Sequence, residues 1–139
     1  MMVPGECAMK ILHVTIYASD IDASIDFYQK VAGLSVIREK TAGENRVVFL
    51  SNGTQEFCLE LAKGNAEKHF AGENISIGFG CEDLDEQRER LASLGITAGP
   101  LISPRPDVRF FFISDPDGLQ IQFMETPKQS EIPQETEGN

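Results

Sequence analysis

The stretch RFFFISDPDGLQIQFME, residues 109–125, decides the fold, because it has the pattern of two short strands joined by a tight turn. Pro116 fixes φ for the first corner, Asp117 tolerates the second, and Gly118 adopts the positive φ that closes a hairpin. Side chains of a strand alternate between its two faces, so the second arm predicts one apolar and one polar face. The apolar set is Leu119, Ile121 and Phe123, and the other set is Gln120, Gln122 and Met124.

Length and composition indicate one globular domain. The chain has 139 residues, of which 41% are hydrophobic and 24% are charged, and it carries a net charge of −10. The negative charge argues against nucleic acid as a partner, since phosphates would be repelled. Apolar runs are only strand-sized and the first ten residues lack the apolar region of a signal peptide, so we expect no membrane segment. Three cysteines fit a reducing compartment, and we expect a cytoplasmic protein.

The first half of the chain has the pattern βαβββ. After a flexible leader at 1–10, residues 11–17 predict a strand, and Ser19 or Asp20 then caps a helix over 22–31 that Gly33 ends. In that helix Ile25, Tyr28 and Val31 fall at helical spacing. Three short strands follow at 34–41, 46–51 and 56–61, separated by loops of hairpin type.

The second half repeats this order. A polar link leads to a strand at 75–81, a helix at 84–94, a broken strand around 96–103, and the hairpin at 109–125. His13 lies seven residues before Asp20, and Ser76 lies seven before Asp83. His13 and Glu60 are 47 positions apart, whereas Ser76 and Gln122 are 46 apart. The period of about 62 residues predicts two copies of one unit, with unit one at 11–62, the link at 63–73, unit two at 74–126 and a disordered acidic tail at 127–139.

We therefore expect an α+β fold in which two tandem βαβββ units form curled mixed sheets around a cup, with the helices outside. The repeat-related positions in the cup are His13, Glu60, Ser76 and Gln122. The other residues expected to line it, and to contact a small-molecule ligand, are Thr15, Tyr17, Cys58, Gly78, Phe110, Phe112, Gln120 and Met124.

Two segments resemble the vicinal oxygen chelate superfamily, which includes glyoxalase I, bleomycin-resistance proteins and extradiol dioxygenases. The stretch DFYQKVAGL, residues 26–34, resembles the first helix of that family and its exit. The stretch DPDGLQIQF, residues 115–123, resembles the last hairpin, and the pattern as a whole is most similar to glyoxalase I-like proteins.

The resemblance implies a divalent metal, Zn²⁺, Ni²⁺ or Mn²⁺, held by a His and a Glu from each unit. Carried over to this chain, the positions are His13, Glu60, Ser76 and Gln122, so half of the set departs from the family pattern. A neutral alcohol is a poor ligand compared with imidazole, and an amide oxygen carries no charge. We expect a weak or partial metal site that uses His13, Glu60 and Gln122.

Several other side chains have simpler interpretations. Cys58 could act as a nucleophile, but no neighbouring histidine accompanies it along the chain, and a small buried apolar role is favoured. His69 in the link could replace the missing imidazole, although a solvated loop residue is the simpler reading. The four acids at the helix starts are typical of helix caps rather than of a calcium site; they are Asp20, Asp22, Asp83 and Asp85.

Two functions remain open on the sequence. In the first, the resemblance implies a glyoxalase-like lyase or isomerase in which Glu60 removes a proton next to a carbonyl of a small oxygen-rich substrate. In the second, the chain is a metal-free small-molecule binding protein of the bleomycin-resistance kind. Dioxygenase chemistry is disfavoured because Ser76 stands at the second histidine position. In both cases the resemblance implies a homodimer.

Overall fold

The computed structural model describes residues 11–54, 57–64 and 74–126. The chain divides into two compact units, Met1–Phe70 and Ala71–Asn139. The predicted leader, most of the link and the predicted tail lie outside the described residues. Within the described part of the chain, neither helix is long and apolar enough to cross a membrane.

Unit 1 has the predicted βαβββ order. Its elements are β1 (His13–Ala18), α1 (Ile21–Ala32), β2 (Ser35–Ala42), β3 (Asn45–Ser51) and β4 (Cys58–Lys63). The four strands form one mixed sheet in the order β1-β4-β3-β2, in which β1 runs parallel to β4 and the other pairs are antiparallel.

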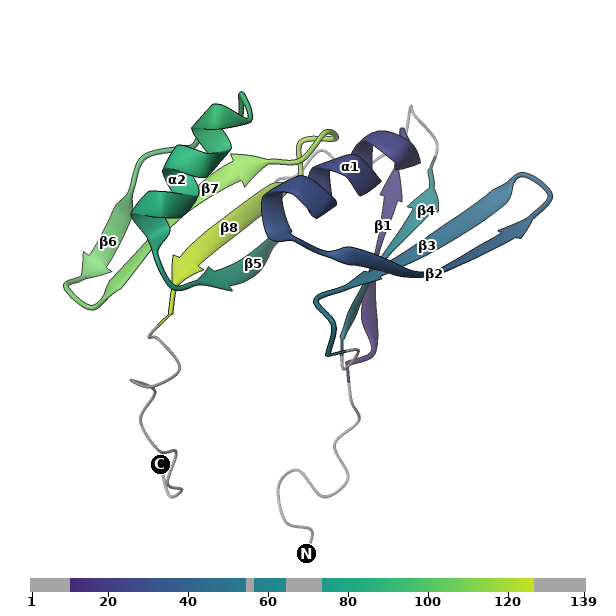
Figure 1. Cartoon of the computed structure of the whole chain (residues 1–139), viewed down its shortest axis with the longest axis horizontal. Helices are drawn as coiled ribbons and strands as arrows, with labels where there is room; N and C mark the ends of the chain where they lie inside the picture. The colour runs from purple at the N-terminus through teal and green to yellow at the C-terminus, as the bar shows by residue number, and fades with distance from the viewer. Residues whose placement is uncertain (1–10, 55–56, 65–73, 127–139) are drawn as a thin grey trace, which may run out of the picture. The chain divides into compact units, whose positions relative to one another are not determined.

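Unit 2 repeats this arrangement strand for strand (Figure 1). Its elements are β5 (Ser76–Cys81), α2 (Leu84–Ser93), β6 (Ile102–Arg105), β7 (Val108–Ser114) and β8 (Gln120–Glu125). The sheet order is β5-β8-β7-β6, again with the first strand parallel to the last. The predicted pair of βαβββ units is therefore confirmed.

Both helices begin at an aspartate cap, as predicted. The Asp20 side chain accepts a hydrogen bond from the Ala23 amide at 3.1 Å, and Asp83 accepts one from the Glu86 amide at 3.0 Å. These bonds satisfy amides that have no partner within the helix. Gly33 ends α1 with φ of 66°, a left-handed conformation that costs glycine little.

In each unit the helix packs against one face of the sheet and leaves the opposite face open. α1 contacts β4, and α2 contacts β8. The alternate residues beneath the helices are buried, among them Val48, Leu50, Leu59 and Leu61 in unit 1, and Phe111, Ile121 and Phe123 in unit 2. Of the residues at helical spacing in α1, Tyr28 and Val31 are buried and Ile25 is half-buried, while Ile21 and Ser24 complete the buried stripe.

The hairpin between β7 and β8 is confirmed, and its turn depends on a residue that the sequence pattern did not single out. The buried Asp115 carboxylate accepts hydrogen bonds from the amides of Asp117 and Leu119 at 2.8 and 2.9 Å. Gly118 has φ of 93°, which an L side chain rarely adopts. Beyond the turn, the predicted alternation in β8 is observed, with Ile121 and Phe123 buried and Gln120 exposed.

The broken strand predicted around 96–103 is shorter and later than expected. Residues 96–101 have no strand conformation, and β6 covers only Ile102–Arg105. Pro100 and Pro104 supply no amide hydrogen for a sheet ladder, which accounts for a short strand at the sheet edge with irregular pairing.

Candidate functional site

The open face of the unit 1 sheet carries a compact polar group of three side chains from β1 and β4. Nε2 of His13 lies 3.1 Å from Oε1 of Glu60, and the Thr15 hydroxyl donates a hydrogen bond of 2.5 Å to the same oxygen. The strand register explains this grouping, since Thr15 is paired directly with Glu60 and His13 is one step along the same face. Sequence positions 45 residues apart thus meet on neighbouring strands.

Glu60 is well shielded, whereas His13 is more open. The Glu60 side chain is 16% exposed and the His13 side chain is 43% exposed. Both contacts are made to Oε1, and within the described ranges no hydrogen bond to Oε2 is found. One carboxylate oxygen is therefore held in place, and Glu60 lines a hollow together with Tyr17 and Lys63.

Cys58 is half-buried and pairs with His13 in the parallel register of β1 and β4. The fold thus places a histidine beside this cysteine, which the linear sequence did not indicate. The imidazole lies against Glu60, and no hydrogen bond joins it to the thiol in the part of the chain that the structure describes. Cys58 as a ligand contact stays a prediction.

Two residues that the sequence patterns did not single out, Phe49 and Arg38, complete this face. Phe49 pairs with Glu60 across β3 and β4, and its ring makes an edge contact with the His13 ring at 6.3 Å between centroids. The guanidinium carbon of Arg38 lies 4.3 Å from the centre of the Phe49 ring. Because Arg38 and His13 cover its ring, Phe49 is only 8% exposed although it lies on the open face.

A β-bulge explains why Arg38 was missed. The pairing of β2 and β3 shifts between Val36 and Arg38, because Val36 pairs with Leu50 and Arg38 already pairs with Phe49. Strict alternation from Val36 would place Arg38 on the helix-covered face, and the extra residue Ile37 moves it to the open face. A charged residue at a nominally covered strand position was the only signal of this shift.

In unit 2 the corresponding face is built differently. Ser76 is exposed and pairs with Gln120, while Gly78 pairs with Gln122. A Cβ placed on Gly78 would lie 3.0 Å from Oε1 of Gln122, so glycine leaves room for the amide to lie over the strand. Gly78 occupies the position that Thr15 occupies in unit 1, and no described residue hydrogen-bonds the Gln122 side chain.

The remaining predicted contacts form an aromatic patch on the same side of the unit 2 sheet. The rings of Phe110 and Phe112 meet edge to face at 5.8 Å between centroids. Phe110 pairs with Met124, and Phe112 pairs with Gln122, across β7 and β8. All four side chains are half-buried, which is suited to stacking on an apolar part of a ligand.

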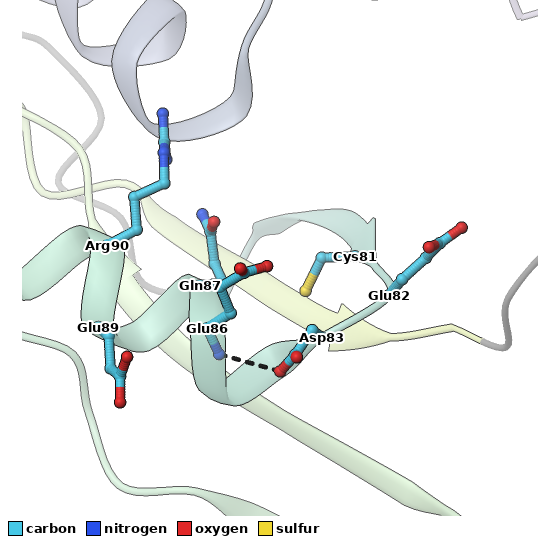
Figure 2. A pocket seen from close by; sticks show the side chains of 7 residues that line it. All are labelled: Cys81, Glu82, Asp83, Glu86, Gln87, Glu89 and Arg90. Carbon is cyan, nitrogen blue, oxygen red and sulfur yellow. Dashed lines mark hydrogen bonds between the residues drawn. The ribbon is translucent and has the colours of Figure 1, made fainter.

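A second hollow lies at the start of α2 (Figure 2). Cys81 lies there among acidic side chains, including Glu82, Asp83 and Glu86. Burial, together with the negative charges of Glu125 and Asp83, raises the pKa of the Cys81 thiol, which keeps it protonated and unreactive at neutral pH. We assign this hollow to the surface around a helix cap.

These features place the chain in a known class. The family model described as Glyoxalase/Bleomycin resistance protein/Dioxygenase superfamily matches residues 10–123. The chain belongs to this superfamily, as the repeated βαβββ sheets also indicate.

Three similar proteins illustrate the relationship. The lactoylglutathione lyase of Neisseria meningitidis is 30% identical over 130 residues, which cover 84% of this chain and 91% of that protein. A probable trivalent organoarsenical cleaving enzyme of Bacillus subtilis is 30% identical, covering 89% of this chain and 85% of the relative. The trypanothione-dependent glyoxalase I of Leishmania major has a similar structure, with a TM-score of 0.71, 26% identity, and coverage of 85% of this chain and 87% of that one.

The family implies a divalent metal, and the donor set fits one only in part. Two ligands of one ion, each bound at about 2.0–2.2 Å, lie roughly 3 Å apart, as Nε2 of His13 and Oε1 of Glu60 do. Ser76 and Gln122 offer only neutral oxygens, which suit zinc and nickel poorly. Among the described residues, no three His, Cys, Asp or Glu side chains cluster closely enough to hold a metal ion. The geometry thus supplies two good ligands.

Proposed function

We propose that the protein is a glyoxalase-like lyase or isomerase in which Glu60 is the general base. The observation that carries this proposal is the Glu60 carboxylate itself, shielded on the open sheet face and held through Oε1 by His13 and Thr15, with no contact to Oε2 from the described residues. A base needs this combination of a held orientation and a free lone pair. Membership of a superfamily that includes lactoylglutathione lyases supports the same chemistry.

In the proposed reaction, Oε2 of Glu60 removes a proton from the carbon next to a carbonyl. The C–H electron pair becomes the new C=C bond, the carbonyl oxygen gains the negative charge, and Glu60 becomes a neutral acid. Glu60 then returns its proton to the former carbonyl carbon, while the hydroxyl proton on the first carbon passes to the negatively charged oxygen, directly or through water, which completes an isomerisation. His13 and Thr15 keep the carboxylate oriented through both steps.

Gln122 stands where a second acid or base would stand in the repeat, and an amide does not accept a proton at neutral pH. The substrate proton therefore cannot be passed between two carboxylates. We infer that Glu60 carries out both proton transfers, directly or through water.

We propose that His13 and Glu60, with Gln122 as a weak third ligand, would hold a divalent cation. When bound, such a cation supplies Lewis-acid polarisation of the substrate carbonyl. The neutral donors of unit 2 predict weak binding.

Exchange of substrate protons with solvent tests the role of Glu60. We expect the protein to accelerate the exchange of the carbon-bound hydrogens of dihydroxyacetone into D₂O, followed by ¹H NMR, with added Zn²⁺, Ni²⁺ or Mn²⁺. Removal of a general base costs about 10²–10⁴-fold, so Glu60→Gln is expected to reduce the rate by at least that lower factor.

Glu44→Gln is the matched control, because Glu44 lies in the exposed turn between β2 and β3 of the same unit. It removes one carboxylate while leaving the His13, Thr15 and Glu60 group intact. Equal rates for Glu60→Gln and the unchanged protein would refute the proposed base. The hemithioacetal of methylglyoxal and glutathione, assayed in the same variants, tests one particular substrate.

A second function, metal-free binding of a small molecule, is favoured by the neutral donors Ser76 and Gln122 and by the Phe110–Phe112 pair. Such a protein would bind a planar compound without any Glu60-dependent proton exchange. Absence of exchange with every cation, together with no heat on titration with these cations, would select this second function.

We also infer that the chain forms a homodimer, as the family resemblance implies. Sedimentation at micromolar concentration is expected to give twice the mass of the chain; a monomer would contradict this inference.

A further inference from the structure

The guanidinium of Arg38, on the open face of unit 1, is not neutralised by a carboxylate of the described chain. Two other arginines pair with acids, Arg46 with Glu39 and Asp22, and Arg109 with Glu125 and Asp85, whereas Arg88 donates to the Gly99 carbonyl. Within the ranges that the structure describes, no carboxylate lies at ion-pair distance from Arg38. In a protein with a net charge of −10, an uncompensated guanidinium on the face that carries Glu60 is unusual.

The position of this guanidinium is built by two features. The bulge at Ile37 moves Arg38 to the open face, and the Phe49 ring beneath it restricts the side chain through a cation–π contact of 4.3 Å. Bulges that re-aim a side chain are common beside active sites. The planar group thus lies over an aromatic ring, and its five N–H donors have no carboxylate partner among the described residues.

Arg38 is also close enough to Glu60 to act on the same small molecule. Phe49 contacts both Arg38 and His13, with centroid distances of 4.3 and 6.3 Å, so the guanidinium and imidazole are at most about 11 Å apart, the sum of the two. His13 in turn lies 3.1 Å from the Glu60 carboxylate. A row of paired residues, Arg38 on β2, Phe49 on β3 and Glu60 on β4, runs across the sheet with a cation at one end and the base at the other.

We propose that Arg38 determines specificity by binding an anionic group, phosphate or carboxylate, on the substrate whose carbonyl end lies at Glu60. This inference rests on the proposed function of Glu60. A guanidinium forms two parallel hydrogen bonds with either anion, while the Glu60 carboxylate repels it. The two ends of the row thus orient the substrate in one direction.

Binding of a matched pair of probes tests the proposal. Dihydroxyacetone phosphate and dihydroxyacetone differ by one phosphate, and their dissociation constants are measured by NMR titration of the ¹⁵N-labelled full chain. Hydrogen bonds to a charged group contribute about 1.5–3 kcal/mol, so we expect the phosphate to tighten binding at least about tenfold. Glycolate and ethylene glycol form a second pair, which tests whether a carboxylate tightens binding in the same way.

Arg38→Met is expected to remove the preference in both pairs, because methionine keeps contact with Phe49 but has no charge. Lys40→Met is the matched control. Lys40 pairs with Val47 and so lies on the same open face of β2, and its substitution also removes one positive charge. It is expected to retain most of the preference.

An unchanged preference in Arg38→Met, its loss in Lys40→Met to the same extent, or no preference in the unaltered protein would each overturn the proposal. A preference for phosphate alone, or for carboxylate alone, would support it and identify the anion. Glu60→Gln separates the two proposals: it is expected to abolish proton exchange and to keep the preference for anions. Proton exchange that survives in Glu60→Gln would refute Glu60 as the general base. The role of Arg38 would then be decided by the Arg38→Met binding data alone.

Discussion

Glu60 has its local environment because two residues of β1 reach the same carboxylate oxygen. Thr15 donates a hydrogen bond to Oε1 and His13 lies 3.1 Å from it. The unit 2 counterpart, Gln122, has Gly78 in place of the threonine. Of these two repeat-related positions, only the one in unit 1 carries a carboxylate with a side-chain hydrogen bond among the described residues.

Removal of the Thr15 hydroxyl is expected to weaken that hold. A hydrogen bond to a charged group contributes about 1.5–3 kcal/mol, so Thr15→Val should slow Glu60-dependent exchange about tenfold or more. Thr15→Ser keeps the hydroxyl and is expected to restore most of the rate, and the pH profile of exchange should shift only in the valine variant. Thr41→Val, at an exposed position of β2, is the control.

A merely structural Thr15 would give a different result. Valine and serine variants would then lose stability in thermal unfolding without separating in their exchange rates or pH profiles.

At the scale of single residues, the sequence predicted which face of a strand a side chain occupies wherever side chains alternate regularly between the two faces. The faces of β1 and β4 follow a period of two, so the neighbourhood of His13, Thr15 and Glu60 could be predicted. Arg38 could not, because a single extra residue at Ile37 reverses the face of everything after it. The role of Asp115 in the last turn was not predicted either, since it depends on the amides of residues two and four positions later.

Among the elements, α2 is attached to its sheet by an ionic contact as well as by its apolar side. The Glu125 carboxylate at the end of β8 accepts hydrogen bonds from the Leu84 amide at 3.1 Å and from Arg109 at 3.0 and 3.1 Å. Arg109 first, and then the Leu84 amide, lower the pKa of Glu125. These bonds join β7, β8 and the first turn of α2.

The lowered pKa predicts how stability changes with acid. Because the folded protein binds the Glu125 proton less readily than the unfolded chain, this carboxylate stabilises the fold above its ordinary pKa of 4.5, and the contribution disappears as the pH falls below that value. Glu125→Gln is expected to lower Tm by a few degrees at neutral pH, with a difference that shrinks towards about pH 3.

Thermal unfolding followed by circular dichroism at a series of pH values makes this comparison. Glu89→Gln, on the exposed side of α2, is the control and should show no such narrowing. A Tm difference for Glu125→Gln that stays constant from neutral to acid pH would contradict the assignment.

Element types and their order were predictable, because caps, glycine stops and turn residues act locally. Asp20, Asp83 and Gly33 fix helix ends, and Gly118 closes the last hairpin. The edge strand β6 was the weak point. Its position depends on pairing with β7 and on the missing amide hydrogens of Pro100 and Pro104, rather than on a local signal.

On the scale of the whole molecule, the repeat is the central feature. Two sheets of identical strand order place His13 and Glu60 in one unit and Ser76 and Gln122 at corresponding positions of the other. The claim that both units contribute to a single site comes from this repeat in the sequence, and it is the claim on which the expected metal and substrate chemistry depends.

The most direct test is a calorimetric titration of the full chain with Zn²⁺, comparing the unaltered protein with Ser76→His and with the double variant Ser76→His/His13→Ala. If both units serve one site, the new imidazole supplies a stronger ligand, and we predict that Ser76→His binds Zn²⁺ at least about tenfold more tightly, with the gain abolished in the double variant. Zinc binding that Ser76→His leaves unchanged, or a gain that persists without His13, would contradict the single shared site.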